Sequence, residues 1–149
     1  MSDAILTKEQ LSEYIDKVIS SLQSGDSVLL SELASLLQTL AIVADDQILL
    51  ALPQSIGSFA SEFARFKTLV SVPFLDAEQR KRCNGSVEKA ESDVVEGLKI
   101  LQKELCNSSQ RNCQNILNAM SMFSKHGYLL YSIRNQYTAV PSQRLMQDE

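Results

Sequence analysis

Residues 49–70 read LLALPQSIGSFASEFARFKTLV, and apolar side chains recur in this stretch at every third or fourth position. That spacing places them on one face of a helix, because 3.6 residues make one turn. Pro53 lies inside the series, so we expect a kinked helix that opens at Asp45–Asp46 and ends at Pro73. The rhythm predicts an unbroken heptad seam typical of coiled-coil packing, formed by Leu49, Leu52, Ile56, Phe59, Phe63, Phe66 and Val70.

Two helices are predicted before this seam. Over residues 7–24, Thr7 and Gln10 form a capping box ahead of a regular apolar stripe, and Gly25 is suited to end the helix. Residues 26–43 are apolar around more than half of a helix circumference. So apolar a helix is usually central in a bundle, although one strip of it could be a groove that a partner helix fills.

Two further helices follow the seam. Asp76 and Gln79 form a second cap pair, and an apolar stripe then runs to about residue 106. The pair Asn84–Gly85 could break this helix. After residues 107–109 a last stripe continues to residue 137, with Gly127 on its apolar seam, where another helix could approach closely.

The connections between these segments are short, which forces consecutive helices to lie antiparallel. We therefore expect an all-α, up-and-down antiparallel bundle of four to five helices. Three of the helices are long, and the first two form a shorter N-terminal hairpin. Residues 1–137 make a single domain in this prediction, and residues 138–149 make a flexible polar C-terminal tail.

Composition fits this picture. Apolar residues make up 44% and charged residues 21%, as in ordinary globular proteins, and the scarcity of hairpin signals argues against an all-β fold. The first residues lack an export signal and the apolar runs are too short to span a bilayer, so we expect a cytoplasmic or nuclear protein without a transmembrane segment. If an export signal had been lost, the Asn-x-Ser triplets at Asn84 and Asn107 would make a secreted helical cytokine a serious alternative.

Catalytic and metal chemistry finds little support. His126 is the only histidine, and between a lysine and a glycine it is expected at the surface. It has no Glu or His three or four residues away, as helical metal motifs require, and no glycine-rich phosphate loop occurs in the chain. Cys83, Cys106 and Cys113 are expected to be reduced, with Cys113 packed or half-buried. We expect no enzyme, no cofactor, and no catalytic or metal-binding residues.

Charge is distributed unevenly. Residues 1–63 hold nine acids and two lysines, a net charge of −7, whereas residues 64–149 hold twelve bases and nine acids, a net charge of +3. Either the two halves complement each other or the second half meets an anionic partner. The run Arg80, Lys81 and Arg82 is the basic candidate surface, read either as a solvated charge run or as a site for an acidic partner.

Aromatic residues supply the other candidate surfaces. Tyr128, Tyr131 and Tyr137, with Phe123 nearby in sequence, resemble interface residues in composition, but burial with bonded hydroxyls explains them equally well. The phenylalanine ladder of residues 59, 63 and 66 is expected in the core, and it would be a dimer seam if it were exposed.

These observations favour a protein–protein interaction module, either an adaptor domain or a small subunit of a larger complex. Its partners would be other proteins presenting helical segments or short motifs, with a homo-oligomer as a further option. Nucleic acid is disfavoured because the basic run is short. The alternative is a helical regulator of the apoptosis or immunity type, whose hydrophobic groove binds an amphipathic peptide. An enzyme or ligand-binding bundle is the third interpretation.

The seam generates a first prediction. Phe63→Asp places a carboxylate at its centre, and burying a charge without a partner costs more than a domain of this size can spare. We expect loss of the cooperative thermal transition in circular dichroism, while Thr68→Asp on the polar face of the same helix keeps it. A folded Phe63→Asp protein with unchanged stability would show that the register is wrong.

Overall fold

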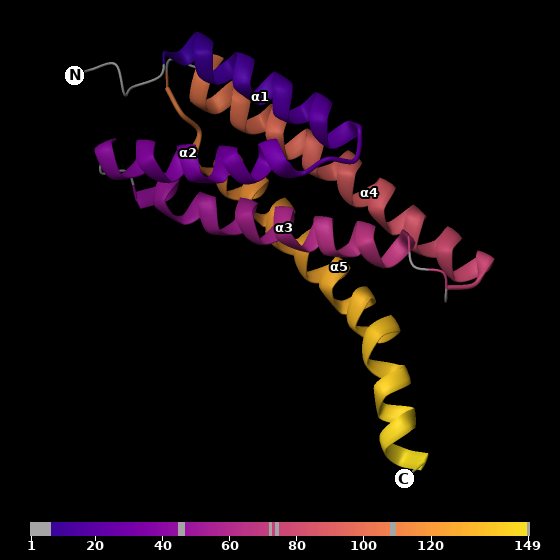
Figure 1. Ribbon diagram of the computed structural model, residues 1–149. Helices are drawn as coiled ribbons and strands as arrows, with labels where there is room; N and C mark the ends of the chain where they lie inside the picture. The colour runs from indigo at the N-terminus through magenta and orange to yellow at the C-terminus, as the bar shows by residue number, and fades with distance from the viewer. Residues whose placement is uncertain (1–6, 45–46, 72, 74, 108–109, 149) are drawn as a thin grey trace.

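The computed structural model describes residues 7–44, 47–71, 73, 75–107 and 110–148, with the backbone alone for residues 44, 48 and 138–148. All of its regular elements are helical (Figure 1). The α-helices are α1 (Lys8–Gln23), α2 (Val28–Ala44), α3 (Gln47–Ser71), α4 (Ala77–Gln102) and α5 (Cys113–Asp148), and a short π-helical segment, η2 (Lys103–Asn107), extends α4. The predicted all-α bundle of three long helices after two shorter ones is confirmed.

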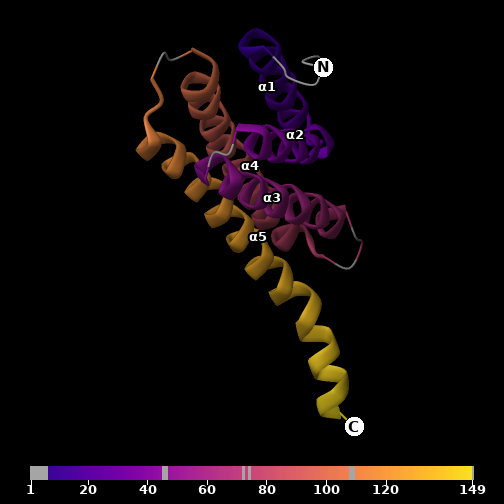
Figure 2. The same cartoon turned by 90° about the vertical axis from the view of Figure 1, so that its left-hand side faces the viewer.

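Consecutive helices run in opposite directions, and each packs on its neighbours (Figures 1 and 2). Helix α1 lies against α2 and α4, α2 against α3, and α5 against both α3 and α4. The order around the bundle is therefore α1, α2, α3, α5 and α4. Helix α5 therefore packs against both α3 and α4, and these two helices also contact each other.

Local sequence signals set several helix ends. Both predicted capping boxes are present: the side chains of Thr7 and Asp76 accept from the backbone N–H groups of Gln10 and Gln79, whose side chains accept in return from the backbone of the capping residues. Gly25 has φ 87°, in the left-handed region that favours glycine after a helix, as predicted. The expected opening of the seam helix at Asp45–Asp46 lies outside the described residues.

The seam of α3 forms the centre of the core. All of its members except the half-buried Val70 are buried, and Phe59, Phe63 and Phe66 are completely enclosed, as predicted. The ring of Phe59 lies 5.6 Å from that of Phe63 and 6.3 Å, edge-on, from that of Phe123 of α5. Pro53 is buried inside α3, which continues through it.

Helices α3 and α5 approach each other closely at Gly127. A Cβ atom on this glycine would lie 3.4 Å from the backbone Cα of Phe59. The small residue therefore lets two helix backbones approach, as the sequence suggested.

Helix α2 differs from the prediction. It was expected to be central, yet it packs mainly on α1 and α3. Val28, Ile42 and Val43 are 59%, 64% and 63% exposed. Apolar composition alone does not enclose a helix, because enclosure depends on how many neighbours the topology provides.

The two long C-terminal helices are also more continuous than the sequence suggested. Helix α4 runs through Asn84–Gly85 without a break. Helix α5 does not stop at Tyr137 but continues as backbone helix to Asp148, and its last turns project beyond the other helices (Figures 1 and 2). The flexibility expected for residues 138–149 stays a prediction.

The junction between α4 and α5 is held by Glu104. Its carboxylate accepts hydrogen bonds from the backbone N–H of Asn112 at 2.8 Å and from the Asn115 side chain at 2.9 Å. The bond from Asn115, followed by the bond from Asn112, lowers the pKa of the Glu104 carboxyl. One acid in η2 thereby fixes where α5 begins.

Two glycines give a paired test. Gly85 is exposed within α4, and among the described residues a Cβ there would meet no atom within 4 Å beyond the backbone of its own helix. Gly85→Ala should therefore stabilise the protein by roughly 0.5–1 kcal/mol, because alanine gains helix propensity and restricts the unfolded chain. Gly25→Ala should destabilise it, since the residue is held at φ 87° beside Lys67. Urea unfolding measures both changes, and equal effects in one direction would contradict the assignment.

Candidate functional site

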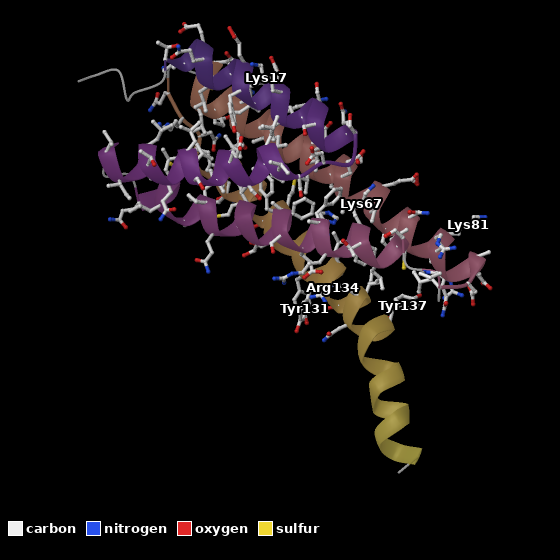
Figure 3. The ribbon with its side chains drawn as sticks, in the orientation of Figure 1. Lys17, Lys67, Lys81, Tyr131, Arg134 and Tyr137 are labelled. Atoms are coloured by element: carbon white, nitrogen blue, oxygen red, sulfur yellow. The ribbon has the colours of Figure 1, made fainter. Side chains whose placement is uncertain are left out.

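The basic run at the start of α4 is partly used within the fold. The Arg80 Nε donates to the backbone carbonyl of Val70 at 3.0 Å, near the end of α3. Arg82 pairs with Glu78 one turn away at 3.0 Å on the exposed surface. Lys81 is exposed at this corner of the molecule (Figure 3). Two of the three side chains therefore make contacts within the molecule, and the binding of an acidic partner by this run stays a prediction.

The predicted tyrosines separate into two places. Tyr128 and Tyr131 are 68% and 45% exposed on α5. Tyr137 lies further along α5, half-buried against the core (Figure 3). It faces the beginning of α4, where burial raises the pKa of the Cys83 thiol. The hydrogen bond with the Tyr137 hydroxyl offsets only part of this rise. Phe123 is completely buried and does not belong to the exposed pair.

A groove of about 720 Å³ opens between α3 and α5 beside the exposed tyrosine pair. Its polar lining is dominated by hydroxyl groups, from Ser55, Ser58 and Ser61 of α3 and Ser124, Tyr128 and Tyr131 of α5. Gly57 and Gly127 supply no side chain, which leaves the groove open between the two helices. The hydroxyls of Ser55 and Ser124 bond to each other at 3.0 Å across it. Sequence reasoning found the tyrosines but missed the serines.

A buried ion pair lies along the groove. Glu62 of α3, only 5% exposed, receives hydrogen bonds on its two carboxylate oxygens from Nε and a terminal nitrogen of Arg134 of α5, the second at 3.1 Å. The bond to Glu62 is the main cause of the raised pKa of the Arg134 guanidinium. That guanidinium also lies 5.6 Å from the centre of the Tyr131 ring (Figure 3). Glu62 therefore fixes Arg134, and Arg134 in turn holds an exposed tyrosine.

A second, smaller groove lies on the other side of α3, against α2. It is lined by Ala34, Ser35, Gln38, Leu50, Pro53 and Gln54. Gln54 lines both grooves, so the two hollows flank the same exposed strip of α3. From Gln47 to Ser61 that helix contains no charged residue.

The structure corrects two sequence expectations. His126 was expected at the surface, but it is 4% exposed, and its Nε2 lies 2.9 Å from Oδ2 of Asp93 on α4. Cys113 was expected to be packed or half-buried, but it is exposed at the first turn of α5. The partner of His126 lies 33 positions away in sequence, so no local pattern could reveal that this histidine turns inward.

The surroundings of His126 are described most simply as helix packing. Ser86 lines the same small hollow, but its hydroxyl bonds to the Arg82 carbonyl of its own helix at 3.2 Å. Over the described ranges, no three His, Cys, Asp or Glu side chains gather in a way that could hold a metal ion. None of the described helices has the length and apolar character needed to cross a membrane.

The ion pair gives the next prediction. Arg134→Met leaves the buried Glu62 carboxylate without both of its guanidinium bonds, which should cost roughly 2–4 kcal/mol of unfolding free energy. Adding Glu62→Leu removes the buried charge, so the double variant should recover part of this loss.

Urea unfolding of both variants measures the coupling between these two residues. The matched control is Arg82→Met, which removes an exposed pair and should leave the midpoint nearly unchanged. Coupling between the two residues would be contradicted if adding Glu62→Leu to Arg134→Met lowered the free energy of unfolding further, by the full cost of an independent substitution.

Comparison with known proteins gave no match to a family model, to a curated protein or to a solved structure. A fold hosts many functions, so the function of a protein depends on the chemistry of its surface.

Proposed function

We propose that this protein is an interaction module that binds another protein through one uncharged surface, the α3 face. This surface consists of Gln47, Leu50, Ala51, Gln54, Ser58 and Ser61 of α3 with Tyr128 and Tyr131 of α5. All eight residues are exposed, and none carries a charge. The proposal rests on one observation. The exposed α3 residues from Gln47 to Ser61 carry no charge, and they lie between two grooves and beside two exposed tyrosines.

The charge pattern distinguishes this face from the surface of α4. Charged residues normally make up about a quarter to a third of a soluble surface, and they are depleted at the centre of protein interfaces. No lysine or arginine occurs between Lys17 and Arg65, and the single charge in α2 is Glu32. In contrast, α4 alone contains ten charged residues. Helix α2 and the Gln47–Ser61 stretch of α3 are therefore depleted of charge relative to α4.

The residue types also suit protein recognition. Tyrosine brings a large contact area at a small cost in side-chain entropy, while serine and glycine adapt to a partner's backbone, and these are the residues that antibody binding loops use most. The α3–α5 groove combines the same types in one place. Tyr131 beside this groove is partly preorganised, because its ring lies against the Arg134 guanidinium, which Glu62 holds in place.

The alternative function is a regulator that binds an amphipathic peptide in an apolar groove. It fits the side chains that line the α3–α5 groove less well. The polar groups that line the α3–α5 groove are the hydroxyls of its serines and tyrosines, the Gln54 amide and the charged side chains of Glu62 and Arg65. Such a lining favours hydrogen-bonded contacts with a polar partner surface. In the proposed role the protein works by binding, not catalysis, as an adaptor domain or small complex subunit in the cytoplasm or nucleus.

The proposal is tested by capture with matched variants. Tyr128→Ser/Tyr131→Ser removes the two exposed aromatic rings beside the α3–α5 groove. Val28→Ser, the control, removes an exposed apolar side chain that lines neither groove. Immobilised protein of each kind is incubated with lysate, and retained proteins are quantified by mass spectrometry.

We expect at least one protein to be retained by the parent and by Val28→Ser but reduced about tenfold or more on the double tyrosine variant, equivalent to roughly 1.4 kcal/mol of binding free energy. Circular dichroism verifies that each variant is folded. Identical retention by all three proteins would remove the α3 face as the binding surface.

A further inference from the structure

We propose that the α3 face pairs with the α3 face of a second copy of this chain, so that the protein forms a two-fold symmetric dimer. This inference rests on the proposed function, because it names the occupant of the same surface. It depends on the arrangement of charge along α3 and on the shape of the two grooves beside it.

Symmetry makes charge the decisive criterion. Close to a two-fold axis a residue meets its own copy, so any charge there meets a like charge and opposes association. A self-binding surface therefore needs a centre without charges. The exposed positions of α3 satisfy this from Gln47 to Ser61, a stretch whose sequence carries no acid and no base.

The charge next to this stretch indicates which pairing is compatible. Arg65 is exposed on α3 and also lines the α3–α5 groove. With the axis near Ile56, two α3 helices run antiparallel, and Arg65 of one copy faces Gln47 of the other. A parallel pairing would place Arg65 against its own copy. The antiparallel arrangement also opposes the two helix dipoles, so it is the one that charge permits.

The small side chains along the exposed side of α3 leave room for a second helix. Gly57 and Ser61 are one turn apart, Ser58 lies between them, and a Cβ on Gly57 would lie 3.9 Å from the Cβ of Ala34 on α2. Such small residues allow a neighbouring backbone to approach, as Gly127 already does for α3 and α5 within the molecule. Tyr128 and Tyr131 stand beside this low strip and supply the aromatic edge of the contact.

Sedimentation velocity over a concentration series tests the proposal on the full chain. The parent protein should approach twice its mass of 16.6 kDa as concentration rises. Ser58→Glu places two carboxylates near the axis and should shift the dissociation constant upward at least tenfold. The matched control is Ser92→Glu, an exposed serine-to-glutamate change on α4, which should leave the dimer unchanged.

A charge-swap mixture identifies the symmetric contact. Ser58→Arg alone should also be monomeric, whereas an equimolar mixture of Ser58→Glu and Ser58→Arg should recover dimers, because opposite charges then meet near the axis. Circular dichroism establishes that the variants are folded, and a variant that fails to fold is replaced by Ser61→Glu or Ser61→Arg.

A parent protein that stays monomeric at every concentration overturns the proposal, and so does a dimer that Ser58→Glu does not weaken. Neither result decides the proposed function. A monomer that still captures a protein through Tyr128 and Tyr131 has a different partner on the same surface, whereas loss of that tyrosine-dependent capture removes the proposed function itself.

Discussion

The close contact between α3 and α5 is the constraint on which the rest of the structure depends. Phe59 and Phe123 meet edge to face in the core, and Gly127 allows the backbone of α5 to approach that of Phe59. Because proteins pack at crystal-like density, a larger side chain at this crossing would force the two helices apart. The separation of these helices sets the width of the groove above the crossing.

The contact determines the chemistry of the surface as well as its shape. It brings Glu62 and Arg134, which are 72 positions apart, into a paired arrangement with low exposure. The same approach gathers serine hydroxyls from both helices and leaves Tyr131 against Arg134. Core and candidate surface are thus two sides of one helix crossing, with phenylalanines inside and hydroxyl groups outside.

Much of the fold could be read from short-range patterns, and the errors have a common origin. The capping boxes, the seam and the positions of the helices along the chain depend on residues within a few turns of one another, and all were predictable. The burial of His126 and the exposure of α2 were not, because each depends on which helix lies alongside. Of the candidate surface, the exposed tyrosines were singled out in sequence, while the serines of α3 were not, because nothing local showed that a groove with α5 would form beside them.

The sequence by itself determined that this chain forms helices and which stripe of each is apolar, because helix periodicity and capping act over three or four residues. It also determined where charge is missing in the third helix, from Gln47 to Ser61. Only the tertiary structure decided that this uncharged stretch borders two grooves and two exposed tyrosines. Neighbouring helices create a surface jointly, so no single segment contains the information that specifies it.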